Sequence, residues 1–509
     1  MLKIIDNWLN STTMYRVICY YLFALLAAAT IFGAFGLIRY HPLSIIASAI
    51  IITLVCVIFN RVFAWAFNAQ TNYESVYITA LILVCLISPI QSAMDWSYYS
   101  ITIWAAVWAM ASKYIFAISK KHIFNPAAFA VVVTQMALGQ SASWWIGTTV
   151  MIPFIILGGV LLTKKMIRAD LVAGFIITAI LVTTIFQLDN PGMLPTALKN
   201  ILLNSPLFFL AFVMLTEPLT MPATRMYRVI YGSLVGLLFV PSVHIGTFYF
   251  APELALVIGN IISYAVSPKT KLMLKLKQKN LVATDTYDFI FTPDQPLKFQ
   301  PGQYLEWTLG HKHPDNRGNR RYFTIASSPT EPNIIMGVKF YKPTSSFKTT
   351  LSTMQPGDTI IASQLSGEFV MPKDPAQPLV FIAGGIGITP FRSMIQYLLD
   401  KNEKRPIVLI YSARTTGDIA YKKIFDEAEK KLGIKTIYVL SDLSSVPKSW
   451  AGERGYVNMD IIKKVVPNLT DCVFYLSGPR SLVLTFQKTL AETDIKKSRI
   501  KQDFFPGFA

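Results

Sequence analysis

The sequence predicts a multi-domain protein with a ten-span α-helical membrane domain, then an antiparallel β-barrel, then a doubly wound α/β domain. Three observations support this prediction. The 509 residues are 53% hydrophobic with a mean hydropathy of +0.44, which is too apolar for a wholly soluble chain. Apolar segments of bilayer length are confined to residues 1–266. Beyond residue 279 short alternating runs appear, and beyond residue 378 apolar runs alternate with helical patterns.

These changes of pattern place the domains at residues 1–266, 267–372 and 373–509. The net charge is +6 in the first domain and +12 in the other two together. Because no stretch interleaves basic and aromatic residues, we interpret this charge as a solubilising face beside anionic lipid and expect no nucleic-acid partner. The four cysteines are too far apart for a disulfide framework, a zinc site or an iron–sulfur cluster, so we expect no metal.

The membrane domain contains ten candidate spans, allowing for spans that are shortened by a break. They lie near residues 14–37, 43–60, 73–90, 99–119, 126–138, 145–163, 169–187, 203–221, 225–240 and 245–266. If the N-terminus is cytoplasmic, basic residues such as Arg61, Lys164 and Arg225 gather in the inner loops. An even number of spans returns the chain to the cytoplasm, where Lys269–Lys279 forms a basic juxtamembrane run. The prediction is a multi-pass inner (plasma) membrane protein with a cytoplasmic N-terminus and cytoplasmic soluble domains.

Polar and helix-breaking residues interrupt this half at two places. Asn125 stands directly before a proline, and residues 216–222 read TEPLTMP. Freed backbone groups at membrane depth are tolerated only against protein or a polar cavity, and a buried acidic residue is costly unless it is used. The candidate binding residues are therefore Asn125, Thr216, Glu217 and Thr220. The alternative is that these residues only end helices at the membrane surface.

Five parts of this half resemble, in content and order, the B subunit of the sodium-translocating NADH:quinone reductase and the D subunit of the Rnf electron-transport complex. They are SVYITALILVCLISP (75–89), Lys113, FNPAAFA (124–130), FVMLTEPLTMPATRMYRVIYG (212–232) and APELALVIGN (251–260). The resemblance implies ten spans and a flavin, FMN or riboflavin, in the membrane domain. Members carry one FMN on a threonine of a Ser-Gly-Ala-Thr motif. This sequence lacks that motif, since residues 138–149 read LGQSASWWIGTT, so we expect a non-covalent flavin.

The predicted barrel has strands at 285–292, 303–309, 321–327, 334–341 and 359–363. The third reads RYFTIAS and unites a guanidinium, an aromatic ring and hydroxyls. A guanidinium can pair with a pyrophosphate, an aromatic ring can stack on a flat ring, and a hydroxyl can hydrogen-bond a ring nitrogen. The alternative is an ordinary barrel strand. The candidate ligand-binding residues on this strand are Arg321, Phe323, Thr324 and Ser327. Further along, a diphosphate at a helix start could meet Ser345, Ser346 and Lys348.

A glycine loop follows the apolar run Leu379–Ala383. Its glycines are Gly384, Gly385 and Gly387. Thr389 suits an N-cap and Pro390 suits the first helical position, so the segment reads as strand, loop and helix with the helix N-terminus aimed at the loop. An anionic phosphate would be stabilised there, and a plain tight turn is the alternative.

Residues 270–509 are similar to the ferredoxin-NADP reductase superfamily through three motifs in order. They are Arg-x-aromatic-Thr-x-x-Ser from Arg321, Gly-Gly-x-Gly-x-Thr-Pro from Gly384, and Ser477-Gly478-Pro479. The resemblance implies FAD on the barrel, NAD(P)H on the sheet and hydride transfer to flavin N5, with Thr324 tuning N5 and Ser477 near the nicotinamide, where many members have cysteine. Among the terminal aromatics, Phe508 is expected to cover the flavin or to pack. Arg414 could pair a 2′-phosphate, and NADH-using relatives can also carry arginine there.

The two resemblances together predict a membrane-bound flavoprotein oxidoreductase. It would take hydride from cytosolic NAD(P)H onto FAD and pass electrons to a flavin or quinone in the membrane domain. A haem-dependent ferric reductase or NADPH oxidase is one alternative, but the membrane half has only His41, His122 and His244, on separate segments. A transporter regulated by a redox domain is the other alternative.

Overall fold

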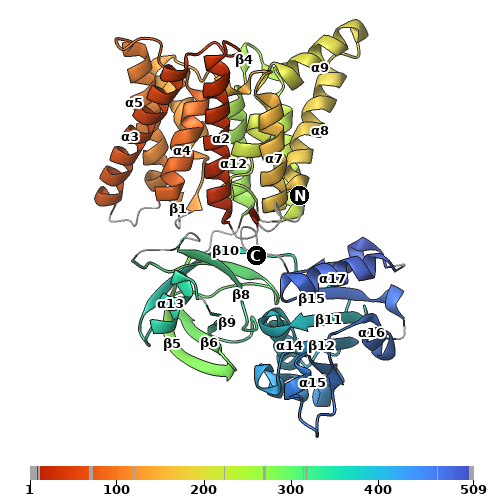
Figure 1. Cartoon of the computed structure of the whole chain (residues 1–509). Coiled ribbons are helices and arrows are strands. Elements are labelled where there is room, and N and C mark those ends of the chain that lie inside the picture. Colours follow the sequence, from red (N-terminus) through yellow and green to blue (C-terminus); the bar gives the residue numbers. More distant parts are fainter. Residues whose placement is uncertain are drawn as a thin grey trace. The chain divides into compact units, whose positions relative to one another are not determined.

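A computed structural model describes residues 8–9, 12–67, 73–118, 121–222, 224–267, 271–312, 315, 319–342, 344–466, 468–493 and 495–503. The chain divides into two compact units, Met1–Lys269 and Thr270–Phe505. Figure 1 shows that helices dominate the first unit and that the second contains two sheets. The predicted order of a helical half, a β-barrel and an α/β domain is therefore confirmed.

The first unit consists mainly of helices that pack on one apolar core. They are α2 (Met14–Ala34), α3 (Pro42–Ala66), α4 (Tyr73–Leu86), α5 (Trp96–Ile115), α6 (Pro126–Leu138), α7 (Ile152–Met166), α8 (Ala169–Ile185), α9 (Leu194–Leu203), α10 (Leu207–Phe209), α11 (Arg225–Phe239) and α12 (Pro252–Val266). Two-residue strands form the hairpins β1–β2 (Ala117–Ile118, Lys121–His122) and β3–β4 (His244–Ile245, Phe248–Tyr249).

Only some of these helices have the length of a membrane span. Among the described residues, α2 and α3 are long and apolar enough to cross a bilayer, and the pair Pro191–Leu203 and Leu207–Met214, bent by 49°, would add a third. A helix occurs in each of the ten predicted segments. In the predicted span 203–221, α10 passes into a π-helix (Leu210–Met214) and then into turns. The helix therefore ends at the expected break over residues 216–222, where prolines at 218 and 222 lack the N–H that a helix needs. The sequence-based expectations missed α9.

The antiparallel sheet of the second unit has the strand order β8-β7-β10-β5-β6-β9. Its strands are β5 (Lys271–Ala283), β6 (Thr286–Pro293), β7 (Tyr304–Thr308), β8 (Arg320–Thr324), β9 (Ile334–Lys339) and β10 (Thr359–Ser366), with helix α13 (Ser346–Thr353) before β10. A hydrogen bond from Ala326 N to Ile335 O (2.8 Å) joins the chain after β8 to β9, so the two edges of the sheet meet as a barrel.

The basic run after the membrane domain is a strand. Lys275 and Lys277 of β5 are exposed and alternate with the buried Leu272, Leu274 and Leu276, which enter the barrel core. The described part of the predicted juxtamembrane segment, Lys271–Lys279, therefore belongs to the barrel, and Lys269 lies outside the described residues.

The second sheet is parallel, with the strand order β14-β13-β12-β11-β15-β16. Its strands are β11 (Leu379–Gly384), β12 (Ile407–Ala413), β13 (Lys435–Leu440), β14 (Glu453–Arg454), β15 (Val473–Ser477) and β16 (Ile500–Gln502). Its helices are α14 (Thr389–Lys401), α15 (Lys422–Leu432), α16 (Met459–Val465) and α17 (Arg480–Ala491). Phe381 packs on one face in a core with α14 and α15, whereas Ile382 faces the other core, with α16 and α17. The sheet is thus covered on both faces, as predicted for a doubly wound domain.

Polar contacts join the barrel to the parallel sheet domain. Tyr421 OH donates to Asp288 Oδ1 (2.5 Å), and Lys339 Nζ pairs with Asp418 Oδ1 (2.6 Å). Arg392 of α14 pairs with Glu331 of the barrel. Burial raises the pKa of Asp288, and the hydrogen bond from Tyr421 offsets part of that rise. These contacts fix the two sheets relative to each other within the second unit.

Candidate functional site

The parallel sheet reverses its winding between β11 and β15, and the two candidate loops leave the sheet at this point. The glycine loop follows β11, and the Ser477-Gly478-Pro479 turn follows β15. In open α/β sheets, ligands bind outside the carboxyl ends of the strands at such a switch point.

The three loop glycines meet different constraints. A Cβ on Gly387 would lie 2.5 Å from Gly478 Cα, and a Cβ on Gly384 would lie 2.8 Å from Pro479 Cδ. These two glycines therefore allow the loop and the turn to pack together. Gly385 has φ +52°, and a Cβ there would meet no atom of the described residues within 4 Å. Its backbone faces open space, which a ligand can approach closely.

The helix after the loop begins differently from the prediction. Thr389 is the first residue of α14 and follows a 3₁₀ turn (Gly385–Ile388), so its expected role as N-cap is wrong. Its hydroxyl donates to Ile386 O (3.2 Å) and thereby closes the turn. Pro390 is the second helical residue, where its missing N–H costs no helical hydrogen bond.

Three polar side chains from separate strands meet beside this loop. Ser477, the last residue of β15, donates to Asp503 Oδ2 at 3.0 Å, and Thr324, the last residue of β8, donates to the same oxygen at 3.4 Å. Ser477 and Thr324 are buried. The structure therefore brings together the residue expected to tune flavin N5, from the barrel, and the residue expected near the nicotinamide, from the parallel sheet.

Asp503 is the residue that the sequence reasoning did not single out. It follows β16, and its second carboxylate oxygen, Oδ1, is shielded from solvent without a hydrogen-bond partner among the described residues. Burial raises the pKa of Asp503 to about 7, and the hydrogen bonds from Ser477 and Thr324 offset part of that rise. A polar ligand that reaches this point would find an acceptor, or a proton, on a buried carboxyl group.

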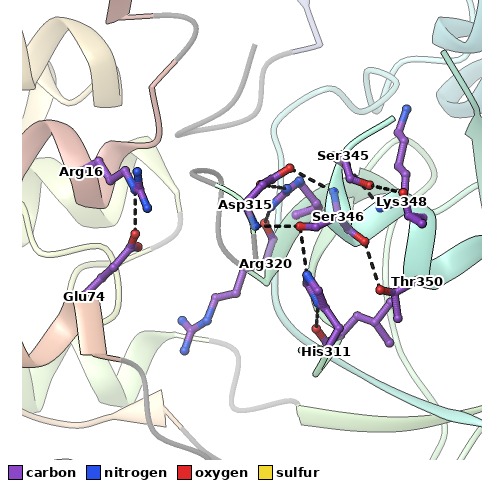
Figure 2. Close-up of polar contacts among 12 residues, drawn as sticks. Arg16, Glu74, His311, Asp315, Arg320, Ser345, Ser346, Lys348 and Thr350 are labelled. Atoms are coloured by element: carbon purple, nitrogen blue, oxygen red, sulfur yellow. Dashed lines mark hydrogen bonds and ion pairs between the residues drawn. The ribbon is translucent and has the colours of Figure 1, made fainter. Parts of the chain in front are cut away.

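Arg321 of the barrel strand β8 lies against helix α13. Arg321 is buried, its guanidinium carbon lies 5.2 Å from the centre of the Phe347 ring, and its Nη2 lies 3.4 Å from Asp315 Oδ1. Figure 2 shows Asp315 against Ser346, whose backbone N–H donates to Asp315 Oδ2 (3.0 Å). The predicted diphosphate residues Arg321 and Ser346 thus converge on one carboxylate.

Other predicted residues of the barrel have structural partners. Ser345 caps α13 by accepting from Lys348 N (3.2 Å), and Lys348 Nζ donates to Lys339 O (2.6 Å). Ser327 accepts from Ile335 N (3.1 Å) through its hydroxyl. The ring of Phe323 lies 6.0 Å, between ring centres, from that of Phe347, at the same place as Arg321.

Arg414, which could pair with a 2′-phosphate, lies beyond the carboxyl end of a strand of the parallel sheet. Arg414 follows β12, its side chain is 77% exposed, and its Nε lies 3.4 Å from Asp442 Oδ2. It is accessible to a nucleotide, but a carboxylate stands beside it. Phe508 lies outside the described residues.

In the first unit Asn125 connects three separate segments. Its Oδ1 accepts from the N–H groups of Ala127 and Ala128 (3.1 Å each), so it caps α6. Its Nδ2 donates to Met214 O (3.2 Å), and its own N–H donates to Asn260 Oδ1 (2.8 Å). Segments 124–130, 212–232 and 251–260, which carry the resemblance, therefore converge at this asparagine.

The remaining candidates of the first unit make local hydrogen bonds. Thr216 donates to Phe212 O (2.8 Å), one helical turn earlier, and Thr220 donates to Glu217 Oε2 (3.2 Å). Asn260 and Lys113 are further buried polar residues of the resembling segments that we did not predict as site residues. Lys113 Nζ donates to the backbone oxygen of Ser75 (2.8 Å).

Models of known protein families match residues in both halves of the chain. Residues 133–271 match the model of the "NQR2, RnfD, RnfE family", and residues 381–488 match that of the "Oxidoreductase NAD-binding domain". Both predicted resemblances are therefore confirmed.

Curated relatives match less than half of the chain. The glycine betaine monooxygenase reductase subunit of Pseudomonas aeruginosa is 26% identical over 230 residues, covering 44% of this chain and 62% of the relative. The flavohemoprotein of Bacillus subtilis is 26% identical over 238 residues, covering 45% and 58%. The chain thus spans about three fifths of the length of these relatives.

Solved structures are similar to a comparable share of the chain. The flavohem-like FAD/NAD-binding domain of nitric oxide dioxygenase from Vibrio cholerae has a TM-score of 0.41 at 18% identity, covering 46% of this chain and 98% of that one. The cytochrome b5 reductase domain of nitrate reductase from Ulva prolifera has a TM-score of 0.41 at 20% identity, with the same coverage.

Proposed function

We propose that this protein is a membrane-bound NAD(P)H-dependent flavoprotein oxidoreductase. It takes hydride from NAD(P)H onto FAD in the second unit and passes electrons into the membrane domain. The observation that carries the proposal is the meeting of Thr324, Ser477 and Asp503 at the switch point of the sheet, where the barrel and the nucleotide-type loop adjoin. The match of residues 381–488 to the oxidoreductase NAD-binding domain supports the proposal.

The residues present fit FAD and a nicotinamide nucleotide. Asp503 Oδ1, which has no partner among the described residues, offers a buried acceptor to a polar ring edge. The space over Gly385, which none of the described residues fills, offers N–H groups and the N-terminus of α14 to phosphate. Arg321 and the start of α13 would hold the FAD diphosphate, with Phe323 beside them. FAD, when bound, accepts a hydride and can release electrons one at a time.

The chain's own groups would orient the reaction. Thr324 and Ser477 share Asp503 Oδ2, so their hydroxyls are held in fixed positions at the junction of the two sheets. Because burial raises the pKa of Asp503 to about 7, this carboxyl group can hold a proton near neutral pH. Its Oδ1 is the atom from which a proton could move to or from a bound ligand.

For the membrane unit we propose a second flavin, FMN or riboflavin, bound without a covalent link near Asn125, Thr216, Glu217 and Thr220. The match of residues 133–271 to the NQR2, RnfD, RnfE family and the convergence of three segments at Asn125 support this placement. Quinone or another acceptor would receive the electrons. We further propose ten spans, three domains bounded near residues 266 and 372, and an inner membrane location with the N-terminus and the reductase unit in the cytoplasm.

Absorbance spectroscopy on the purified full-length protein tests the proposal. We expect flavin bands that bleach when NADH or NADPH is added without oxygen. A Soret band would instead indicate a haem enzyme, and flavin that neither nucleotide reduces would contradict the proposed activity.

A further inference from the structure

A carboxylate of the chain itself occupies the start of helix α13. Asp315 Oδ2 accepts from the backbone N–H of Ser346 (3.0 Å), the first residue of this eight-residue helix, and Asp315 Oδ1 lies 3.4 Å from Arg321 Nη2. The positive end of the helix and a buried guanidinium therefore bind the same carboxylate. Figure 2 shows Asp315 beside Ser346 at the start of the helix.

The backbone of Asp315 is held at the same place. Its N–H donates to Ser346 Oγ (2.8 Å), and Ser346 Oγ also bonds His311 Nε2 (3.0 Å). His311 Nδ1 lies 2.9 Å from Leu309 O, a group that only accepts, so the proton of a neutral imidazole resides on Nδ1 and Nε2 accepts from the serine hydroxyl. Main-chain and side-chain contacts together fix the carboxylate at the helix start.

A diphosphate would use the same donors. The proposed FAD site relies on the Arg321 guanidinium and the first N–H groups of α13, and both already face Asp315. One guanidinium edge and one backbone N–H cannot bind two anions in full at once, and like charges at contact distance repel each other. The two anions must therefore exchange.

We propose that Asp315 is an internal competitor that FAD displaces from the diphosphate subsite. This inference rests on the proposed function and adds a residue that sets the affinity of the enzyme for its flavin. When only a fraction of the molecules has the subsite vacant, the apparent dissociation constant equals the intrinsic constant divided by that fraction. Removing the Asp315 charge raises the fraction and tightens FAD binding.

The experiment measures FAD binding to flavin-free, full-length protein in lipid nanodiscs by quenching of flavin fluorescence. The test variant is Asp315→Asn, which keeps the size of the side chain and removes its charge. The matched control is Asp358→Asn, which makes the same change in the same barrel but beyond the other end of α13, where Asp358 caps a turn at Gln355 N (2.8 Å). We expect a roughly tenfold lower dissociation constant in Asp315→Asn and no change in the control.

Binding rates separate displacement from simple repulsion. Because a side chain changes rotamer much faster than FAD associates, the observed rate rises linearly with FAD concentration in both proteins, and displacement lowers its slope in the wild type to the fraction of molecules whose subsite is vacant. An unchanged or higher dissociation constant in Asp315→Asn, or equal slopes in the two proteins, would overturn the inference while leaving the proposed function intact. Absence of FAD binding in wild type and variant alike would overturn both.

Discussion

The three glycines of the candidate loop are constrained for different physical reasons. Gly384 and Gly387 are required because the Ser477-Gly478-Pro479 turn leaves no space for a Cβ. Gly385 is required by its positive φ, since the space beside it is open. Substitution of Gly385 therefore tests ligand approach with little disturbance of packing.

Gly385→Glu should abolish or strongly slow the bleaching of bound FAD by NAD(P)H. The new carboxylate would extend into the space where we place the nucleotide phosphates, and misplacement of a reactant by about 1 Å can cost about a hundredfold in rate. Stopped-flow absorbance measures the rate. Gly433→Glu is the matched control, because Gly433 also has positive φ (+74°) and no atom within 4 Å of a built Cβ, but it ends α15. Equal rates in Gly385→Glu and the wild type would exclude the glycine loop as the nucleotide site.

Asp503→Asn should change how stability depends on pH. An unfolded Asp titrates near pH 4, whereas burial raises the pKa of folded Asp503 to about 7. Between these values the folded chain holds a proton that the unfolded chain has lost, so the free energy of unfolding falls as pH rises. The variant lacks this pH-dependent loss of stability. Its melting temperature should therefore rise relative to that of the wild type between pH 5 and pH 8. Scanning fluorimetry measures both proteins, and parallel pH profiles would show that Asp503 does not titrate in this window.

Among the secondary-structure elements, prediction from sequence was most accurate where periodicity and boundary residues agree. The run Leu379–Ala383 is buried on both faces and bounded by Pro378 and glycine, and β11 (Leu379–Gly384) matches it closely. The strand β5 was missed because its lysines were interpreted as a membrane-surface run, although its leucines alternate with them. The three-residue strand β16 is too short for a periodic pattern, so no sequence pattern indicates the position of Asp503.

Tyr421→Phe should weaken the connection between the barrel and the parallel sheet. The substitution removes the donor to Asp288, whose carboxyl is buried, and leaving a buried acceptor without its partner costs about 1–3 kcal/mol. Denaturant unfolding followed by flavin fluorescence measures the loss. Tyr456→Phe is the control, because Tyr456 is 80% exposed. Equal losses in the two variants would contradict a specific role for the Tyr421 hydroxyl.

At the scale of the whole molecule, the chain joins a helical unit that matches the NQR2, RnfD, RnfE family to a unit that matches the oxidoreductase NAD-binding domain. Each unit has its own apolar cores. The proposed function places one flavin in each unit.

Flavin extraction should therefore yield two flavins per full-length chain and one, FAD, per fragment of residues 267–509. We expect both to be released by acid, because the sequence lacks the motif for covalent attachment. Chromatography of the extracts, with intact-protein mass spectrometry, measures number, identity and attachment. A single flavin in the full-length chain would contradict the second site, and a fragment without FAD would contradict the placement of FAD on the barrel.

The sequence by itself determined the order of the domains, most of their strands and helices, and the three motifs of the second unit, because hydrophobic periodicity and glycine or proline positions are local properties of the chain. Only the tertiary structure decided which distant residues meet. Thr324 and Asp503 are separated by 179 positions, and Asp315 and Ser346 by 31, yet each pair is in contact. Such contacts arise because strands from separate parts of the chain must pack to bury their apolar faces, and local patterns do not encode which polar residues that packing brings together.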